Sequence, residues 1–271
     1  MADIRVAIAG IRGKMGQEVA RSVAAAPGLE LVAGIDRRRA QDRELSSGPP
    51  LFTDAQACCS ETRPDVLIDF THREAALVTV QQAIAHGVRP VIGTTGFAPQ
   101  ELKMFSAELE ERGIGGLYAP NFAVGALLMM RFATMAARYL SAAEIVEYHH
   151  DGKRDAPSGT ARMTAQRMAA AMRDEMARRD ETAGRDAESV PRAAQQVESQ
   201  RFHLVDGVPV HSVRLPGLVA HQEVLFGGEG ELLTIRHDSL GRHCFMPGVL
   251  LGVRSVMTVR GLVEGLENFL F

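Results

Sequence analysis

Cysteine is scarce in this chain, with three among 271 residues, and two of these, Cys58 and Cys59, are adjacent. Neighbouring cysteines do not readily bridge each other, and Cys244 is far away in the sequence, so nothing predicts a disulfide framework. No group of cysteines has the spacing of a metal site, and we expect no bound metal. This cysteine usage is typical of a protein in the reducing cytoplasm.

An excess of charge is also missing, because 30 Lys and Arg residues face 33 Asp and Glu residues and the formal net charge is −3. That balance gives no electrostatic reason to bind nucleic acid. No apolar run is long enough to cross a membrane. The opening residues, MADIRVAIAG, lead directly into a strand pattern. We therefore expect a cytoplasmic protein with no signal peptide and no membrane or nucleic-acid partner.

The first part of the chain alternates short apolar runs with helical patterns. Strands separated by helices of this size indicate βαβ units, and hence an α/β fold with a parallel sheet. The predicted strands are Ile4–Gly10, Leu29–Asp36, Asp65–Phe70, Arg89–Ile92 and Gly116–Ala119, and the predicted helices are Met15–Ala26, Arg73–His86 and Pro99–Arg112.

The pattern changes after Asn121 and predicts a second, α+β domain on an open sheet. Gly227, Gly228 and Gly230 predict a hairpin turn. The last stretch, Pro247–Phe271, is predicted to be helical with no sheet of its own and to pack on the first domain. The other predicted elements are helices at Val124–Tyr139 and Gly159–Arg179, strands at Glu144–His149, Val210–Leu215, Val219–Gly227 and Glu231–Arg236, and a loop at Asp180–Gln200.

A glycine-rich turn, GIRGKMG, follows the first predicted strand and places glycines at Gly10, Gly13 and Gly16. Such a turn lets the backbone approach a pyrophosphate, and the N-terminus of the next helix binds the charge. Asp36 ends the second strand, where a carboxylate can accept hydrogen bonds from an adenosine ribose. A glycine turn alone is also a common packing device, but its place in the first βαβ unit favours a dinucleotide site.

Three arginines, Arg37, Arg38 and Arg39, come directly after Asp36. They can pair with the 2′-phosphate of NADPH, whereas Asp36 favours the free ribose hydroxyl of NADH. The alternative is an exposed basic loop without a ligand. Together, the carboxylate and the arginines predict that both NADPH and NADH are used, with affinities within about tenfold of each other.

Two polar turns close the fourth and fifth predicted strands, GTTG at Gly93–Gly96 and APNF at Ala119–Phe122. Ligands bind at the carboxyl ends of strands in parallel sheets. Either turn alone would be ordinary turn chemistry. Beside a dinucleotide loop, the two together predict contacts near the nicotinamide.

The segment HHDGKRDAPSGTA, starting at His149, is the most informative part of the chain. A histidine such as His149 can donate a proton near neutral pH, and Lys153 can pair with a carboxylate. Ser158 and the residues after it predict a helix start, whose N–H groups attract anions. The segment therefore predicts a proton donor for a small substrate with carboxylates. The alternative is that the two histidines merely end a strand.

A second group of polar residues, in the segment HSVRLPGLVAHQEVLFG, has two interpretations. His211, Arg214, His221 and Glu223 resemble a metal cluster, and strand alternation puts His221 and Glu223 on one face. No supporting residues for a metal are evident, so a strand buried in a subunit interface is favoured. Separately, Arg242 and Phe245 are candidates for contacts on the nicotinamide side.

Taken together, the segments of this chain resemble the 4-hydroxy-tetrahydrodipicolinate reductase (dihydrodipicolinate reductase) family of bacterial lysine and diaminopimelate biosynthesis. HHDGKRDAPSGTA is highly specific, whereas the glycine loop is not. The full motif favours catalysis over a mere strand end. In family order, the matching segments are VAIAGIRGKMG, GTTG, APNFAVG, EYHHDGKRDAPSGTA, HSVRLPGLVAHQEVLFG and GRHCFMPGVLLGVRSV.

The resemblance implies an NAD(P)H-dependent reductase of 4-hydroxy-tetrahydrodipicolinate, a small dicarboxylate. It implies a Rossmann-like dinucleotide-binding domain at residues 1–121 and 240–271. It also implies a substrate-binding domain at 122–239 that forms a homotetramer through its sheet. Two other functions stay open: an NAD(P)-dependent oxidoreductase acting on an amino or imino acid, and a non-catalytic nucleotide sensor. The sensor predicts a damaged proton-donor segment, and here that segment is intact.

The resemblance also implies the roles of single residues. His149 matches the proton donor of the family, and Lys153 matches its substrate-binding lysine. The positions that hold the substrate carboxylates are His150, Gly159 and Thr160. The matches to nucleotide contacts are Gly10, Gly13, Lys14, Met15, Asp36, Arg37, Gly93, Thr95, Ala119, Asn121 and Phe122. Lys14 departs from the pattern, since many members carry Arg there, and lysine keeps the charge but loses planar stacking.

Overall fold

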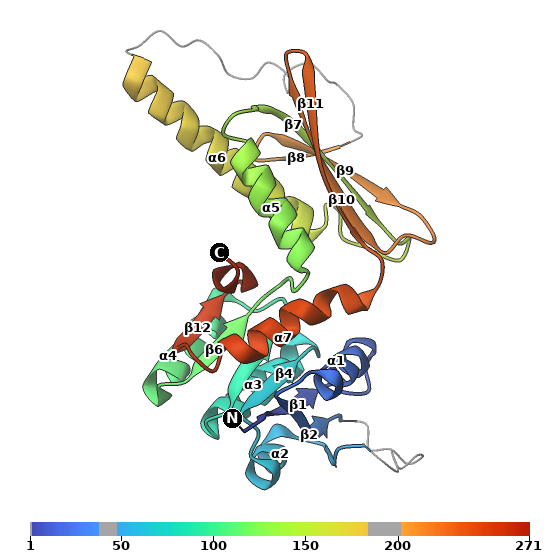
Figure 1. The fold of residues 1–271 in the computed structure, drawn as a ribbon, viewed down its shortest axis with the longest axis vertical. Coiled ribbons are helices and arrows are strands. Elements are labelled where there is room, and N and C mark those ends of the chain that lie inside the picture. The colour runs from blue at the N-terminus through green and yellow to red at the C-terminus, as the bar shows by residue number, and fades with distance from the viewer. Residues whose placement is uncertain (1, 38–47, 184–201) are drawn as a thin grey trace. The chain divides into compact units, whose positions relative to one another are not determined.

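The chain divides into two compact units, Met1–Val124 with Arg242–Phe271 and Gly125–Gly241 (Figure 1). The computed structural model describes residues 2–37, 48–183 and 202–271, with the backbone alone at 179–183. Arg38 and Arg39 lie outside the described residues.

A seven-stranded sheet forms the first unit, in the order β12-β6-β5-β4-β1-β2-β3. Every neighbouring pair in it is parallel. The predicted α/β class with a Rossmann-like sheet is thus confirmed, and the run from β3 to β6 has the strand order typical of dinucleotide-binding domains. The strands are β1 (Ile4–Ala9), β2 (Leu29–Ile35), β3 (Leu51–Phe52), β4 (Val66–Asp69), β5 (Arg89–Ile92), β6 (Gly115–Tyr118) and β12 (Gly261–Glu264).

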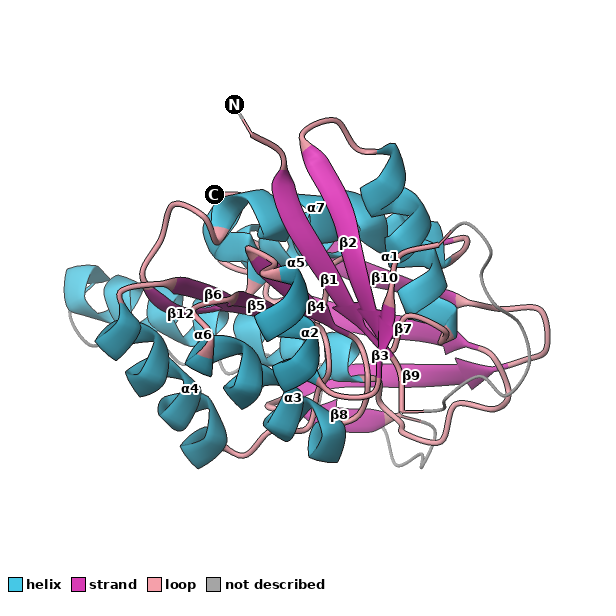
Figure 2. Cartoon of the chain, turned by 90° about the horizontal axis from the view of Figure 1, so that it is seen from below, coloured by secondary structure: helices cyan, strands magenta, loops and turns pink. Residues whose placement is uncertain are grey.

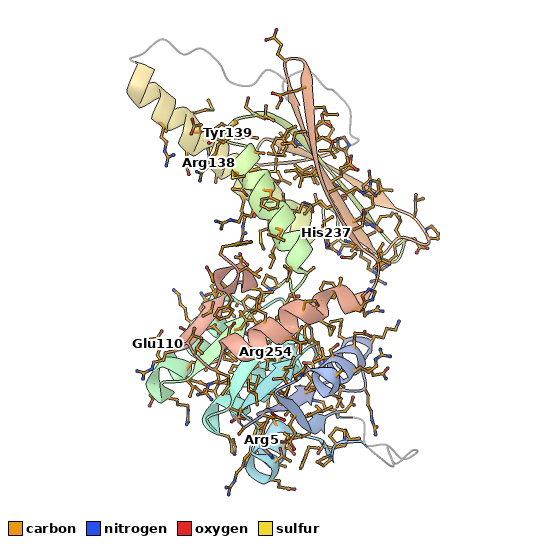
Figure 3. All side chains as sticks on the ribbon, viewed as in Figure 1. Arg5, Glu110, Arg138, Tyr139, His237 and Arg254 are labelled. Atoms are coloured by element: carbon orange, nitrogen blue, oxygen red, sulfur yellow. The ribbon has the colours of Figure 1, made fainter. Side chains whose placement is uncertain are left out.

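Helices cover both faces of this sheet (Figure 2). One face carries α1 and α7, which contact each other, and the other carries α2, α3 and α4. Arg254 on α7, labelled in Figure 3, donates a hydrogen bond to the carbonyl of Pro27 just after α1, at 3.1 Å. The helices are α1 (Lys14–Ala25), α2 (Ala55–Thr62), α3 (Arg73–Ala85), α4 (Pro99–Arg112) and α7 (Met246–Ser255).

The central strands of this sheet are buried on both sides, which explains their uninterrupted apolar runs. Val6 and Ile8 on β1 and Leu67 and Ile68 on β4 are fully buried. Parallel strands covered by helices lack the alternation of half-exposed strands. The apolar runs therefore sufficed to locate these strands from the sequence.

Two parts of the first unit differ from the sequence expectation. The prediction that Pro247–Phe271 is helical without a sheet is wrong beyond α7, because β12 pairs with β6 at the sheet edge. A strand of four residues, here GLVE, is too short for its periodicity to separate strand from helix. β3 and α2 were not predicted, although Asp54 caps α2 by accepting the N–H of Ala57 at 2.8 Å, a signal present in the sequence.

The second unit is built on a five-stranded sheet in the order β11-β10-β7-β9-β8. β7 and β9 are parallel, and the other neighbours are antiparallel. The hairpin between β10 and β11 confirms the predicted glycine turn. The elements are α5 (Val124–Ala136), β7 (Ala142–His149), α6 (Gly159–Ala183), β8 (His203–Val205), β9 (Val208–Arg214), β10 (Ala220–Gly228) and β11 (Glu231–Ser239).

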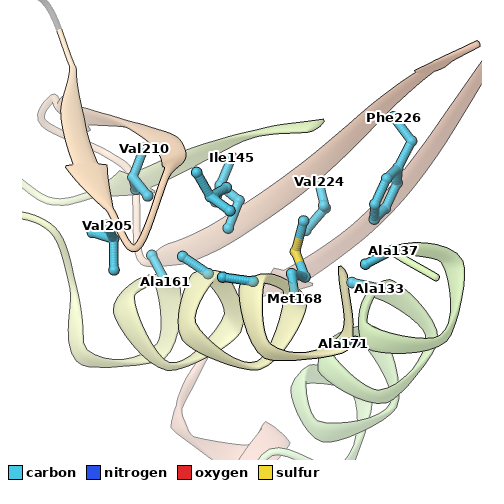
Figure 4. Packing of buried hydrophobic residues seen from close by; sticks show 13 residues of the cluster. Ala133, Ala137, Ile145, Ala161, Met168, Ala171, Val205, Val210, Val224 and Phe226 are labelled. Atoms are coloured by element: carbon cyan, nitrogen blue, oxygen red, sulfur yellow. The ribbon is translucent and has the colours of Figure 1, made fainter. Parts of the chain in front are cut away.

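One face of this sheet, the inner face, packs on α5 and α6 (Figure 4). Most of it is apolar: Ile145 on β7 lies beside Val210 and Val224 of the neighbouring strands, and all three are fully buried. The next row towards the end of β7 is polar instead. It places Glu147 between Ser212 on β9 and Gln222 on β10.

Helix α6 is longer than the sequence predicted. The expected loop Asp180–Gln200 begins inside the helix, since residues 180–183 continue α6. The polar residues there are typical of a loop, but a solvated helix tolerates them equally well. Residues 184–200 of that predicted loop lie outside the described residues.

Candidate active site

A cavity of about 670 Å³ lies at the carboxyl ends of β1, β2 and β4. Ligands bind at this switch point in doubly wound sheets, because the connections leave neighbouring strands in opposite directions. Four of the predicted nucleotide contacts, Gly10, Gly13, Asp36 and Arg37, line the cavity. The other lining residues are Ala9, Arg12, Ile35, Thr53, Phe70, Thr71, His72, Ala75 and Thr79.

The N-terminus of α1 opens from the same loop. Gly13 is its N-cap, no side chain caps it, and Lys14 and Met15 are its first residues. A Cβ at Gly16 would lie 2.1 Å from the carbonyl oxygen of Gly10, so only glycine allows this close approach of helix and strand. An uncapped helix end held against a glycine loop fits the pyrophosphate of a dinucleotide.

The predicted turns GTTG and APNF follow β5 and β6. Because these strands are parallel, both turns lie at the carboxyl ends of the sheet strands, as the cavity does. A Cβ at Gly93 would lie 2.0 Å from a ring carbon of Phe70. The ring of Phe70 also packs on that of Phe122, with centroids 5.4 Å apart, and it lines the cavity. Phe70 thus connects the cavity with both turns. The other residues predicted in these turns are the exposed Thr95, the buried Ala119 and the half-buried Asn121.

A buried carboxyl group, Asp69, ties the ends of β4 and β5 together. Its Oδ1 accepts hydrogen bonds from the N–H of Thr71 at 2.9 Å and from the hydroxyls of Thr71 and Thr94 at 2.8 and 2.7 Å. Burial raises the pKa of Asp69, and these hydrogen bonds oppose the rise. Among the described residues, its Oδ2 is buried without a hydrogen-bond partner.

The predicted proton donor, His149, stands at the end of β7 in the second unit. Its side chain is 15% exposed, and its Nδ1 contacts Oε2 of the fully buried Glu147. Arg214 on β9 holds the same carboxylate with both arms, at 2.9 Å to Oε2 and 2.7 Å to Oε1. Burial raises the pKa of Glu147, but the hydrogen bonds from His149 and Arg214 outweigh it and lower the pKa to about 2. Glu147 is therefore charged at neutral pH.

The predicted helix start lies in the same hydrogen-bond network. The hydroxyl of Ser158 caps α6 by accepting the N–H of Ala161 at 3.2 Å, and the N–H of Ser158 donates to Oε1 of Glu147 at 3.2 Å. Gly159 and Thr160, predicted to hold carboxylates, form the first turn of α6. One buried carboxylate thus joins the histidine to the helix start.

Lys153 lies in the loop between β7 and α6. Its Nζ pairs with Oδ1 of Asp155 at 2.8 Å, and this lysine lowers the pKa of Asp155. Arg214 reaches the same loop and donates to the carbonyl of Asp155 at 2.8 Å. His150, the other predicted carboxylate contact of the loop, is exposed. A substrate carboxylate would compete with Asp155 for Lys153.

Several residues of these sites are not among those that the sequence motifs predicted. Glu147 precedes His149 by two positions and so shares its face of β7, a signal that strand alternation carries. Phe70, Thr71 and His72 follow β4, and the rule that singled out the ends of β5 and β6 applies to them equally.

The metal interpretation of His211, Arg214, His221 and Glu223 finds no support in the geometry. Arg214 is bound to Glu147, while His211 meets Glu144 at 2.9 Å and His221 meets Asp238 at 2.7 Å. No group of three or more potential ligands among the described residues could hold a metal ion.

Within the same residues, no helix is long and apolar enough to span a membrane.

Known proteins match this chain along its whole length. The family model described as "Dihydrodipicolinate reductase, N-terminus" matches residues 4–122, and "Dihydrodipicolinate reductase, C-terminus" matches 125–270. The 4-hydroxy-tetrahydrodipicolinate reductase of Geobacillus kaustophilus is 48% identical over 98% of this chain and 99% of its own. That of Bacillus subtilis is 46% identical over 98% of both chains.

Solved structures agree with these matches. A dipicolinate-bound dihydrodipicolinate reductase from a Paenisporosarcina species superposes with a TM-score of 0.83 at 42% identity, covering 98% of this chain and 99% of that one. An amine dehydrogenase from Mycobacterium smegmatis, with a TM-score of 0.62, 13% identity and coverage of 97% and 95%, shares the fold alone. With both halves matched and close relatives spanning its full length, the chain belongs to the dihydrodipicolinate reductase family of oxidoreductases, as its motifs predicted.

Proposed function

We propose that this chain reduces 4-hydroxy-tetrahydrodipicolinate to tetrahydrodipicolinate in the diaminopimelate route of lysine biosynthesis, with NADPH or NADH as the reductant. The observation that carries the proposal is the hydrogen-bond network around Glu147 in the second unit. There, Glu147 contacts both His149 and the N-cap of α6. The family assignment supports the same reaction.

The first domain, residues 1–121 with 240–271, binds the dinucleotide in this proposal. The glycine loop and the start of α1 hold the pyrophosphate, and Asp36 and Arg37 meet the adenosine ribose and its 2′-phosphate. Because Asp36 repels the phosphate that Arg37 attracts, both cofactors are used with affinities within about tenfold. The proposed contacts are Gly10, Gly13, Lys14, Met15, Asp36 and Arg37, with Gly93, Thr95, Ala119, Asn121 and Phe122 towards the nicotinamide.

The second domain, residues 122–239, takes a small dicarboxylate. Dipicolinate, bound by the Paenisporosarcina relative, is a ligand of this class. Lys153 exchanges Asp155 for one substrate carboxylate, and the N–H groups of Gly159 and Thr160 at the start of α6 bind the other together with His150. Held at both ends, the substrate is fixed in one orientation before the reaction.

Because the product lacks the 4-hydroxyl group of the substrate, this group must leave as water together with a hydrogen of the neighbouring ring carbon, which gives dihydrodipicolinate. The reduction of dihydrodipicolinate then joins a hydride transfer to a proton transfer. When bound, the nicotinamide supplies the hydride that C4 of the substrate receives. His149, as an imidazolium, donates the proton that quenches the electron density at C3. Lys153 keeps the substrate oriented for both transfers.

We place this enzyme in the cytoplasm as a homotetramer assembled through the second domain. The inner face of the five-stranded sheet is covered by α5 and α6. The opposite, outer face carries Leu232, which is 71% exposed on β11. An exposed leucine on the sheet face that the unit leaves open supports a subunit interface there.

The decisive experiment follows NADPH oxidation with the product of a dihydrodipicolinate synthase as substrate. The wild type should turn over, and His149→Gln should lower kcat at least ~10²-fold, because a general acid is lost. Calorimetric titration should show that NADPH binds to His149→Gln as tightly as to the wild type. Activity on amino or imino acids alone would assign a different reductase, and wild-type turnover by His149→Gln would remove its role as donor.

A further inference from the structure

The two ring nitrogens of His149 have different surroundings. A neutral imidazole carries its hydrogen on one nitrogen, and the partner of that nitrogen decides which one it is. In this chain Nδ1 contacts Oε2 of Glu147. The protonation of Glu147 therefore decides which nitrogen can exchange a proton with a substrate.

Three donors besides His149 hold the Glu147 carboxylate. Oε1 accepts from Nη2 of Arg214 at 2.7 Å and from the N–H of Ser158 at 3.2 Å, while Oε2 accepts from Nη1 of Arg214 at 2.9 Å. The side chain is fully buried, so water does not compete. A carboxylate held in this way stays ionised and can only accept hydrogen bonds. The hydrogen between Glu147 and His149 must then belong to Nδ1.

We propose that Glu147 is a positioning residue that holds His149 in the Nδ1–H tautomer, so that Nε2 is the atom that takes up and delivers the proton. The inference rests on the proposed function, in which His149 is the donor. It assigns to Glu147 the orientation of the imidazole and the choice of its reactive nitrogen.

Arg214 extends this arrangement to the substrate loop. The same Nη2 that holds Glu147 donates to the carbonyl of Asp155 at 2.8 Å, and the side chain of Asp155 holds Lys153. The planar guanidinium serves both partners at once, which the single ammonium of a lysine cannot reproduce. The orientation of His149 and the placement of Lys153 thus depend on one arginine.

In the described part of the second unit, few other charges face Glu147 and His149. Arg214 comes from β9, and Lys153 and Asp155 come from the loop and pair with each other. β11 contributes His237, which is labelled in Figure 3 and pairs with Gln222 on β10. α6 contributes the uncharged Thr164, whose hydroxyl accepts from Gln222 at 2.9 Å. Among these neighbours, Glu147 is the anion in contact with His149.

The variant that tests this role is Glu147→Gln, which keeps the shape and removes the charge. In either orientation, its amide NH₂ faces a donor of Arg214, and in one of them it also faces Nδ1 of His149. We expect kcat to fall by on the order of 10²- to 10⁴-fold, the range up to the loss seen when the carboxylate of a Ser-His-Asp triad is replaced. KM should change far less. A kcat within about threefold of wild type would contradict the proposal.

The matched control is Glu144→Gln on the same strand. Glu144 also meets a histidine, His211, at 2.9 Å, but on the outer face of the sheet. This variant should keep wild-type kcat. An equal loss in both variants would mean that any carboxylate on β7 matters for folding, and it would overturn a specific role for Glu147.

Nitrogen-15 NMR of the wild-type histidine rings tests the tautomer without any need for a folded Glu147 variant. The signals of His149 are assigned by their absence in His149→Gln. At a pH where this ring is neutral, we expect hydrogen on Nδ1 and none on Nε2. Hydrogen on Nε2 would overturn the proposal even if His149→Gln is inactive. Conversely, wild-type turnover by His149→Gln would refute the donor role and leave the tautomer as a separate result.

Discussion

Acid should destabilise the second unit through one buried carboxylate, Glu147. Its pKa is about 2 in the folded chain, against an ordinary value of 4.5. Because the folded value is the lower one, the stabilisation is complete above about pH 5 and is lost as the pH falls towards 2. The difference between the two values corresponds to about 3 kcal/mol in the free energy of unfolding, of which about 2 kcal/mol is lost by pH 3.

Urea unfolding of the wild type and Glu147→Gln between pH 7 and pH 3 isolates this contribution, since other carboxylates titrate in both proteins. The difference between their free energies of unfolding should be constant above about pH 5 and shrink by about 2 kcal/mol at pH 3. A difference that stays the same throughout would refute the reasoning. Carbon-13 NMR of the Glu147 carboxyl offers a direct check, since its shift should stay unchanged from pH 7 to about pH 4.

Three further predictions concern the ligand sites. Lys153→Ala should weaken inhibition by pyridine-2,6-dicarboxylate by roughly 10- to 100-fold, the loss of a charge-assisted hydrogen bond, and equal inhibition constants would show that Lys153 holds no carboxylate. Arg37→Ala should weaken NADPH more than NADH in calorimetric titrations, with a gap that shrinks as salt is added, whereas equal weakening would make Arg37 a solvated charge. Gly16→Ala should lower the free energy of unfolding by about 1–3 kcal/mol, because its Cβ meets the backbone of Gly10. Gly227→Ala, whose Cβ would meet nothing within 4 Å, is the control, and equal losses in both would contradict the packing argument.

Elements that carry their own boundary signals were predictable from the sequence. α4 begins at Pro99 and is followed by Gly113 in the left-handed conformation, and both ends agree with the prediction. The apolar runs of the parallel strands gave the fold class, and the HHDGKRDAPSGTA segment gave the family. Both conclusions are confirmed by the sheet order and by the matching relatives.

What escaped prediction depends on partners distant in the sequence. Arg214 and Glu147 are 67 positions apart in the sequence, and no pattern around either residue predicts that they bind each other. β12 is a strand because β6 offers it an edge, not because its four residues show a period. The individual roles of the cofactor and substrate contacts remain predictions, because they depend on bound molecules.

The place of β12 in the first sheet has a consequence for synthesis on the ribosome. The first unit is interrupted by Gly125–Gly241 and completed by α7 and β12 at the C-terminal end. At about 5–20 residues per second, the inserted unit takes roughly 6–23 s to emerge, and during that time the edge of β6 has no partner strand. The continuous second unit therefore has all of its residues available before the first unit does. A nascent chain stopped before residue 242 would carry an open sheet edge of the kind that chaperones cover.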